Sequence, residues 1–225
     1  MIKLKQLLFE STAPNIFIPR RTEDRVDRYI KQYIRDGGKG KLDISYMYLT
    51  KLPDVLKNIK IDGDFNCEGN HIESLENFPK SVGGAINLAW NKLKSLEGLN
   101  IEVANAGDYP GDSFNCKGNY LTDLKGGPKV VKGNYNCSEN DLVSLKGAPE
   151  KIEGYFYCGH NKLTSFVGGP IFVAKDFYGS FNNLESLEGL SKFIGGNLSL
   201  IAMHKIFTVR QIRAISDVKG RIEFV

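Results

Sequence analysis

The chain has 225 residues, of which 41% are hydrophobic and 25% are charged, as in an ordinary globular protein. It contains no apolar run of about 18 residues, which argues against a membrane span, and the short apolar patch after Met1 ends in Glu10, which argues against a secretory signal peptide. The net charge of +4 is uneven, because residues 1–41 carry ten Lys or Arg against five Asp or Glu, and residues 204–225 carry five against two. The middle of the chain is therefore mildly acidic, so no nucleic-acid partner is expected.

Residues 1–21 are predicted to be a leader and linker. Met1–Glu10 is short, amphipathic and basic, and Ser11–Asn15 is small and polar. Of the thirteen glutamates, only Glu10 has Leu or Ile two residues before it. These residues resemble the capsid-targeting propeptide of internal proteins from T-even-like phages, which implies cleavage between Glu10 and Ser11. The alternative is an N-terminal amphipathic turn that packs on the next helix.

Residues 22–41 are predicted to hold a capping helix. Apolar residues recur at helical spacing on one face of Thr22–Asp36, namely Val26, Tyr29, Ile30, Tyr33 and Ile34. Thr22 suits the N-cap, and Gly37-Gly38 are expected to end the helix. Such a helix would cover the first unit of the segment that follows.

Residues 42–203 repeat one motif. A typical copy reads Phe65-Asn-Cys-Glu-Gly-Asn-His-Ile-Glu-Ser-Leu75. A divergent copy begins at Leu42, and a fading one is Leu198-Ser-Leu200. Six copies share an asparagine, at spacings of 21, 28, 21, 21 and 21 residues: Asn70, Asn91, Asn119, Asn140, Asn161 and Asn182. A fixed period of this length is the signature of a solenoid.

This motif resembles the leucine-rich-repeat family, whose core reads L-x-L-x-x-N-x-L, and most closely its short bacterial and phage forms with Pro after the last leucine. The resemblance implies an α/β repeat solenoid of about seven or eight short parallel strands, with helical caps at the N- and C-terminal ends. It also implies that the solenoid binds another protein. A period of 21 residues leaves room only for an extended segment or a short tight helix on the return side.

Alternation within the motif predicts which side chains are buried. In Phe-x-Cys, the first and third residues point to one face of a strand and the middle residue to the other. The apolar first and third residues are expected inside, and the repeated asparagines are expected to bond buried turn amides. The cysteines recur at one repeat position, which favours stacked core side chains over a metal or redox role: Cys67, Cys116, Cys137 and Cys158.

The outward strand positions form the candidate recognition surface. Asparagines occupy most of this stripe, and tyrosines, which are enriched at binding hot spots, occupy its C-terminal part. Trp90 is either an exposed anchor or edge packing, and an insertion within residues 100–113 is either a binding loop or a tolerated one. The candidate binding residues are Asn66, Asn87, Asn115, Asn136, Tyr155, Tyr157, Tyr178, Trp90 and Tyr109. The flanking polar residues Asp64, Ser113, Asn134 and Asp176 belong to the same stripe. The alternative is a solvated sheet face without a partner.

Residues 204–225 are predicted to close the solenoid, with a short helix over Thr208–Asp217 and a strand over Arg221–Val225. The three histidines, His71, His160 and His204, are scattered, and the sequence has no P-loop, nucleophile elbow or HExxH motif. Enzyme activity, a cofactor and a metal site are therefore not expected.

These observations together predict a non-enzymatic protein-binding module. The first hypothesis is a phage virion-associated or capsid-internal protein that binds a phage or host protein. The second is a cytoplasmic adaptor or effector that binds a host protein, and the third is a glycan-binding surface on the Asn/Tyr stripe. The expected location is the virion or the host cytoplasm, and the sequence does not determine the oligomeric state.

Overall fold

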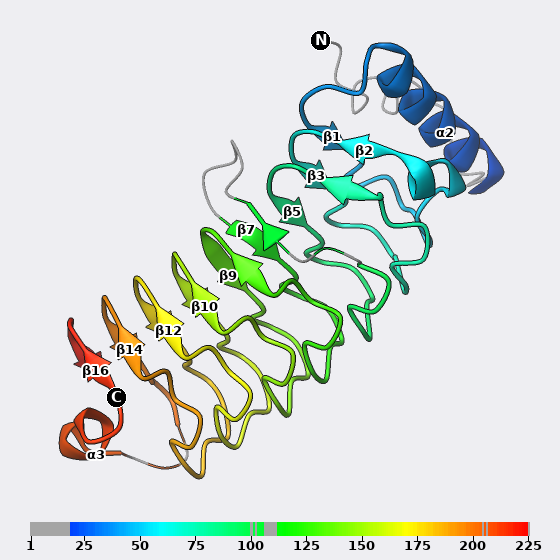
Figure 1. Cartoon of the computed structure of the whole chain (residues 1–225). Coiled ribbons are helices and arrows are strands. Elements are labelled where there is room, and N and C mark those ends of the chain that lie inside the picture. The colour runs from blue at the N-terminus through cyan, green and yellow to red at the C-terminus, as the bar shows by residue number, and fades with distance from the viewer. Residues whose placement is uncertain are drawn as a thin grey trace.

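The computed structural model describes residues 19–99, 101, 103–105, 112–203, 205 and 207–224. In this part of the chain the repeats stack side by side into an elongated solenoid, with α2 at one end and α3 at the other (Figure 1). The leader with Glu10 and Ser11, the insertion residue Tyr109, and His204 lie outside the described residues.

Each turn of the solenoid adds a short strand to a parallel sheet. Neighbouring strands are one repeat apart in the sequence, so that Phe65 pairs with Ile86 and Phe156 with Phe177. In the described residues this main sheet has nine strands, in order: β1 (Leu42–Asp43), β3 (Phe65–Asn66), β5 (Ile86–Asn87), β7 (Asp112–Asn115), β9 (Asn134–Asn136), β11 (Phe156–Tyr157), β13 (Phe177–Tyr178), β15 (Leu198–Ser199) and β17 (Ile222–Glu223). The predicted short parallel strands are confirmed.

A second set of parallel strands lies just before the main strands in each repeat. Two of them, β2 (Lys60–Ile61) and β4 (Ser81–Val82), form a pair. Six more form a second sheet: β6 (Val103–Ala104), β8 (Val130–Val131), β10 (Lys151–Ile152), β12 (Phe172–Val173), β14 (Phe193–Ile194) and β16 (Asp217–Val218). The return side was predicted only as extended or tightly helical. A tight helix occurs once in the described residues, as the 3₁₀ helix η1 (Asp54–Asn58).

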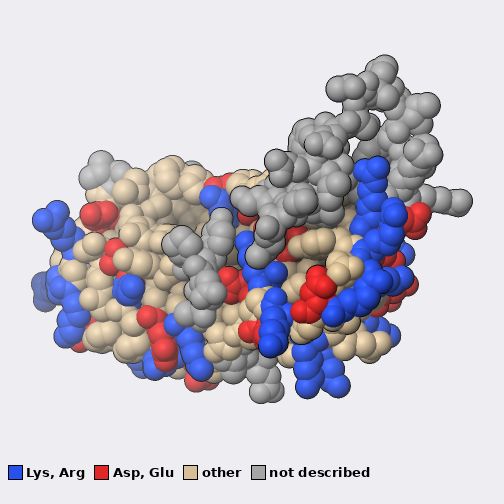
Figure 2. Space-filling view, turned by 90° about the horizontal axis from the view of Figure 1, so that it is seen from above, with Lys and Arg blue, Asp and Glu red and all other residues tan. Residues whose placement is uncertain are grey.

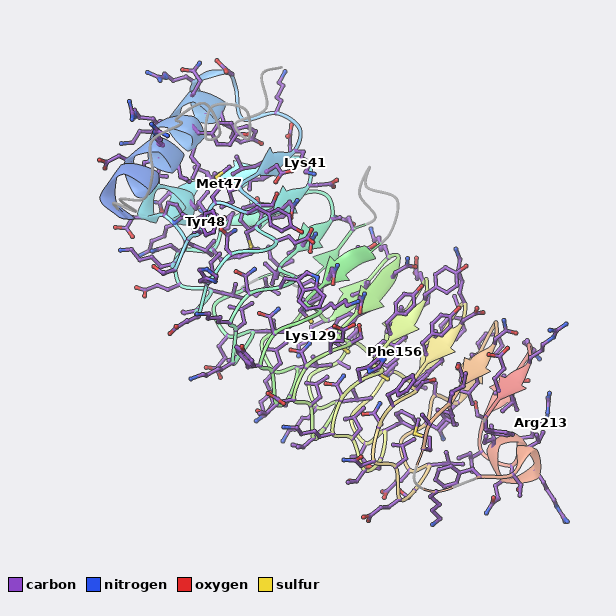
Figure 3. The ribbon with its side chains drawn as sticks, turned by 180° about the vertical axis from the view of Figure 1, so that it is seen from behind. Lys41, Met47, Tyr48, Lys129, Phe156 and Arg213 are labelled. Carbon is purple, nitrogen blue, oxygen red and sulfur yellow. The ribbon has the colours of Figure 1, made fainter. Side chains whose placement is uncertain are left out.

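The interior follows the predicted alternation. From β1 to β15 the first and third core positions are enclosed, as for Phe156 and Cys158, which are fully buried, while Tyr157 between them is only partly buried. In the last strand, β17, Ile222 and Phe224 are partly exposed. Phe156 is labelled in Figure 3 among the side chains that fill the stack. A repeat of this kind cannot bury its own apolar face, so its stability depends on the neighbouring repeats.

The repeated asparagines form a buried ladder, as predicted. Asn140 accepts a hydrogen bond from the amide of Leu121 in the preceding repeat (3.1 Å) and donates to the carbonyls of Cys116 (3.0 Å) and Cys137 (3.2 Å). The other five asparagines repeat this pattern of bonds to their own and the preceding turn: Asn70, Asn91, Asn119, Asn161 and Asn182. The ladder therefore satisfies buried backbone groups that lie beyond the reach of either sheet.

The cysteine column is buried, as predicted. All four thiols are free and enclosed, and the Cys137 Sγ donates to the Tyr157 carbonyl oxygen at 3.3 Å. Burial raises the pKa of the thiols of Cys67, Cys137 and Cys158 above the usual range. These thiols are therefore protonated near neutral pH, which suits a packing role and not a nucleophile.

The N-terminal cap differs from its prediction at two points. Helix α2 spans Pro19–Arg35, so it begins before Thr22, and its first residue is a proline, which is favoured at the first helical position. Val26 and Ile30 are buried, but Ile34, one residue before the end of the helix, is 40% exposed. The glycines end the helix as predicted, since the amide of Gly38 donates to the carbonyl of Tyr33.

The C-terminal segment continues the solenoid as well as capping it. Helix α3 spans only Val209–Arg213, and Thr208 and Gln211 form a capping box at its start. Asp217 was predicted to be helical but lies in β16, because its backbone pairs with β14. The predicted closing strand is present as β17, which pairs with β15.

Candidate binding surfaces

The asparagines on the main sheet face mainly stabilise the backbone next to them. The side-chain oxygens of Asn66, Asn87, Asn115 and Asn136 each accept a hydrogen bond from the backbone amide two residues later. This is the turn geometry that asparagine favours. Asn66 is also only 9% exposed, so its prediction as a contact residue is wrong. The amide nitrogen of Asn87 also donates to Glu68 Oε2 at 3.0 Å, so this row is bonded to its neighbours as well as to its own turns.

The polar residues just before the first core residue of each main strand form another ladder. Asp64 accepts from the amide of Ala85, Asn134 from that of Tyr155, and Asp176 from that of Asn197 (2.7–3.0 Å). Asp64 and Ser113 are moreover buried, so their prediction as part of an outward stripe is wrong. Their position is a corner of the backbone, where the next repeat covers the side chain.

The tyrosines form a cluster on adjacent strands near the C-terminal end of the face. The rings of Tyr157 and Tyr178 are parallel, with centroids 4.9 Å apart and an interplanar angle of 3°. The Tyr155 ring lies 6.0 Å from Tyr157 and 6.4 Å from Tyr178, and the Lys175 ammonium lies 4.9 Å from its centroid. The structure thus brings together the three predicted tyrosines, which we call the tyrosine cluster.

The tyrosine cluster is held in place by its own contacts. The hydroxyl of Tyr178 donates to Asp176 Oδ2 at 2.9 Å. Partial burial, together with this bond and the aspartate charge, raises the pKa of Tyr178 to about 12, so its hydroxyl stays neutral throughout the physiological range. The cluster therefore presents rigid, uncharged aromatic surface with a polar rim, as binding hot spots do.

A second feature lies at the turn after each main strand. The residue before each ladder asparagine, or before its equivalent in the first and last turns, has a φ between +54° and +68°. This is the left-handed region, which bulky residues rarely adopt. Along the solenoid the position holds Tyr46, Gly69, Trp90, Gly118, Glu139, His160, Phe181 and Ala202. We call this column the turn ledge.

Aromatic rings on the turn ledge pack against the next repeat. A Cβ atom at Gly69 would overlap the Tyr46 ring, and one at Gly118 would overlap the Trp90 ring. Farther along, His160 and Phe181 stack with centroids 4.2 Å apart. Trp90 thus meets both alternatives raised for it, because its ring packs on Gly118 while 47% of the residue stays exposed.

A shallow groove of about 450 Å³ runs beside Trp90. Its lining includes the side chains of His71, Trp90, Lys92, Tyr120 and Glu139. These residues come from four successive repeats, so sequence reasoning singled out only Trp90. The signal that was available is the alternation of glycine and aromatic residues just before the asparagines.

Charge is distributed on the molecule much as the sequence indicated. On the face shown in Figure 2, lysine and arginine side chains gather towards the ends and along one edge, and a broad uncharged area lies between them. Among the described residues no cluster of three or more His, Cys, Asp or Glu side chains could hold a metal ion. No helix in the described ranges is long and apolar enough to cross a membrane.

The solenoid has a counterpart of known structure. The leucine-rich-repeat domain of a Shigella effector superposes with a TM-score of 0.59 over 89% of this chain and 88% of that chain, at 18% sequence identity. At this identity the likeness shows the fold, and it confirms the leucine-rich-repeat solenoid predicted from the motif. No protein-family model matches the sequence, and no curated protein matches it.

Proposed function

We propose that this chain is a non-enzymatic protein-binding module whose main contact surface is the tyrosine cluster. The observation that carries the proposal is the arrangement of Tyr155, Tyr157 and Tyr178 on adjacent strands of a stacked sheet. These side chains are already ordered by one another and by Asp176, so a partner would lose little side-chain entropy on binding them.

The rest of the main sheet face suits a supporting role in this interface. Asn136 lies next to Tyr157 on the neighbouring strand, with Asn115 beyond it, and the hydroxyl of Ser138 donates to Asn136 Oδ1 at 2.7 Å, so a bonded polar margin lies beside the tyrosines. Hot spots of this kind are commonly surrounded by weaker contacts that exclude water. The glycan alternative for this stripe has less support, because the asparagine oxygens are engaged in their own turns.

The role of a host-directed effector or adaptor is the finer proposal that the fold likeness favours, since the similar domain belongs to a Shigella effector. The role of a virion or capsid-internal protein rests on the leader alone, and no comparison supports it. The location, virion or host cytoplasm, is likewise a proposal. N-terminal peptide mass spectrometry of the native protein and of purified particles separates the effector role from the virion role. A protein that begins at Ser11 in particles supports the virion role. A protein that keeps Met1 and is absent from particles excludes that role.

The tyrosine cluster is tested by replacing Tyr155, Tyr157 and Tyr178 with alanine and capturing proteins from an extract of the natural source. We expect a protein bound by the wild type to lose about 2 kcal/mol or more of binding energy, at least thirtyfold in affinity. The matched control removes two exposed tyrosines from the turn edge, Tyr48 and Tyr120, and should bind that protein normally. Unchanged affinity in the triple variant would refute the proposed surface.

A further inference from the structure

The groove beside Trp90 lies at the turns after the main strands, whereas the tyrosine cluster lies on the sheet face. Its floor is aromatic, and its sides carry both hydrogen-bond donors and acceptors. We infer that this groove binds an uncharged sugar, with one sugar ring stacked on Trp90. The inference does not rest on the proposed protein-binding function.

The first argument is the position of Trp90 between two glycines of the turn ledge. Its φ of +54° is shared by other ledge residues, so the backbone conformation by itself does not distinguish it. The equivalent positions in the two neighbouring repeats are Gly69 and Gly118. The 47% exposed indole therefore has no ledge side chain on either side of it.

The second argument is the packing of the indole on Gly118. Gly118 leaves room for the indole, which no residue with a Cβ atom would do. The ammonium of Lys117, the residue before Gly118, lies over the ring at 5.5 Å from its centroid and is held there by an ion pair with Glu139 (3.0 Å). These contacts hold the indole in one orientation, and the exposed part of the ring can contact a ligand.

The third argument is the chemistry of the walls. His71, Lys92 and Tyr120 are exposed and sit one residue after the ladder asparagines of three successive repeats. The phenol and the imidazole can donate or accept hydrogen bonds, the ammonium donates, and the Glu139 carboxylate accepts. A pyranose needs this combination, because it presents C–H groups on a face of the ring and hydroxyl groups around its edge.

Charge and size favour a small neutral ligand. Glu139 is neutralised by its ion pair with Lys117 (3.0 Å), so the groove wall carries a single lysine charge, that of Lys92, among the residues that line it. The groove therefore lacks the concentrated charge that a phosphate or an acidic peptide would require. Its volume of about 450 Å³ lies within the range of small-molecule sites, roughly 300–1,000 Å³, and suits one or two sugar rings.

The experiment uses the fluorescence of Trp90, which is the only tryptophan in the chain. The full chain is titrated with glucose, galactose, N-acetylglucosamine, maltose, cellobiose, lactose and N,N′-diacetylchitobiose, each to tens of millimolar. We expect a saturable change in intensity or wavelength with at least one of these sugars. Tyr120→Ala and Glu139→Gln should each weaken that response by about three- to tenfold, as expected for the loss of one hydrogen bond.

The controls separate this site from the rest of the surface. Phe181→Ala removes another aromatic residue of the turn ledge, and Tyr157→Ala disrupts the tyrosine cluster; both should leave sugar binding unchanged. Trp90→Phe, followed by calorimetry, should weaken binding of the sugar. Thermal unfolding of each variant shows whether it is folded, so a loss of binding with an unchanged midpoint is a loss at the site.

Two outcomes overturn the inference. The first is the absence of a saturable response to every sugar in the panel; if a proline decapeptide then saturates the signal, the groove is a docking site for a peptide. The second is a response to a sugar that survives unchanged in both Tyr120→Ala and Glu139→Gln. Since Tyr157→Ala reports only on the proposed protein interface, failure of either proposal leaves the other standing.

Discussion

The ladder asparagines and the turn ledge are neighbours in the sequence, yet they differ in what they tolerate. The ladder holds the same residue in six repeats, whereas the preceding position changes from Gly69 to Trp90 to Glu139 to Phe181. The turn ledge keeps a φ between +54° and +68° throughout the stack, whichever residue it holds. The ladder side chain is enclosed with its polar atoms bonded, while large ledge side chains such as Trp90 and Phe181 are about half exposed. Enclosure, and not backbone shape, therefore decides which position can vary.

The distinction fails if a ladder asparagine can be replaced with little loss of stability, so Asn140→Ala is its most demanding test. Its loss leaves the amide of Leu121 and the carbonyls of Cys116 and Cys137 without this partner in a buried site. We expect the free energy of unfolding in urea to fall by roughly 3 kcal/mol or more. The exposed Asn183→Ala is the matched control and should change stability by less than about 0.5 kcal/mol. Similar values for the two variants would contradict the distinction.

Gly118→Ala tests whether some positions of the turn ledge require glycine. The new Cβ atom would be strained at a φ of +66° and would displace the Trp90 ring. We expect a loss of about 2 kcal/mol and a red shift of tryptophan fluorescence as the ring moves into water. Gly40→Ala carries only the strain, because its φ is +75° and no atom lies within 4 Å of the added group. Equal losses without a fluorescence shift would show that the ring is not seated on Gly118.

Tyr135→Phe sharpens the comparison inside the core. Tyr135 is fully buried between Phe114 and Phe156, and its hydroxyl makes no hydrogen bond of ordinary geometry; the Cys116 thiol near it is a weak acceptor. Removing the hydroxyl should raise the free energy of unfolding by about 1 kcal/mol. Phe156→Tyr is the reverse change and should lower it. A stabilising effect of Phe156→Tyr would mean that the core accommodates hydroxyl groups.

Ala202→Gly measures the cost of a side chain at the turn ledge without a ring contact. Ala202 is exposed and has a φ of +55°, so glycine should stabilise the fold by about 0.5–1 kcal/mol. Ala214 is also exposed but has a φ of −73°, and Ala214→Gly should destabilise by a similar amount. Chemical denaturation of both variants checks the prediction, and effects of the same sign would argue against conformational strain at the ledge.

The smallest expected effect concerns Tyr178, whose pKa is raised to about 12. A pKa that is higher in the folded state contributes stability that is present below pH 10 and is lost as the pH rises through about 12. Asp176→Asn should lower this pKa and reduce the alkaline loss of stability, since the aspartate charge favours the neutral phenol. Ultraviolet titration of phenolate formation, compared with Tyr178→Phe, checks the change. An identical titration curve in Asp176→Asn would exclude the aspartate as a cause.

Much of the architecture could be predicted from the sequence. A period of 21 residues with Phe-x-Cys alternation determines a stack of parallel strands, since side chains on a strand point alternately to its two faces. The same pattern predicted the buried cysteines, the ladder and the tyrosines on the outer face. The helix cap at residues 19–35 and the short C-terminal helix were predicted with errors of a few residues, because end residues depend on local pairing.

The tertiary structure alone decided what the surface side chains do. Asn66, Asp64 and Ser113 alternate outward in the sequence but are buried by the adjoining repeat. The return strands pair into a second sheet because each finds its partner one repeat away. The Trp90 groove is lined by residues from four repeats, so the sequence of a single repeat does not predict its shape. Periodicity determines whether a side chain points in or out, but what it touches depends on neighbours about twenty residues distant, which only stacking brings into contact.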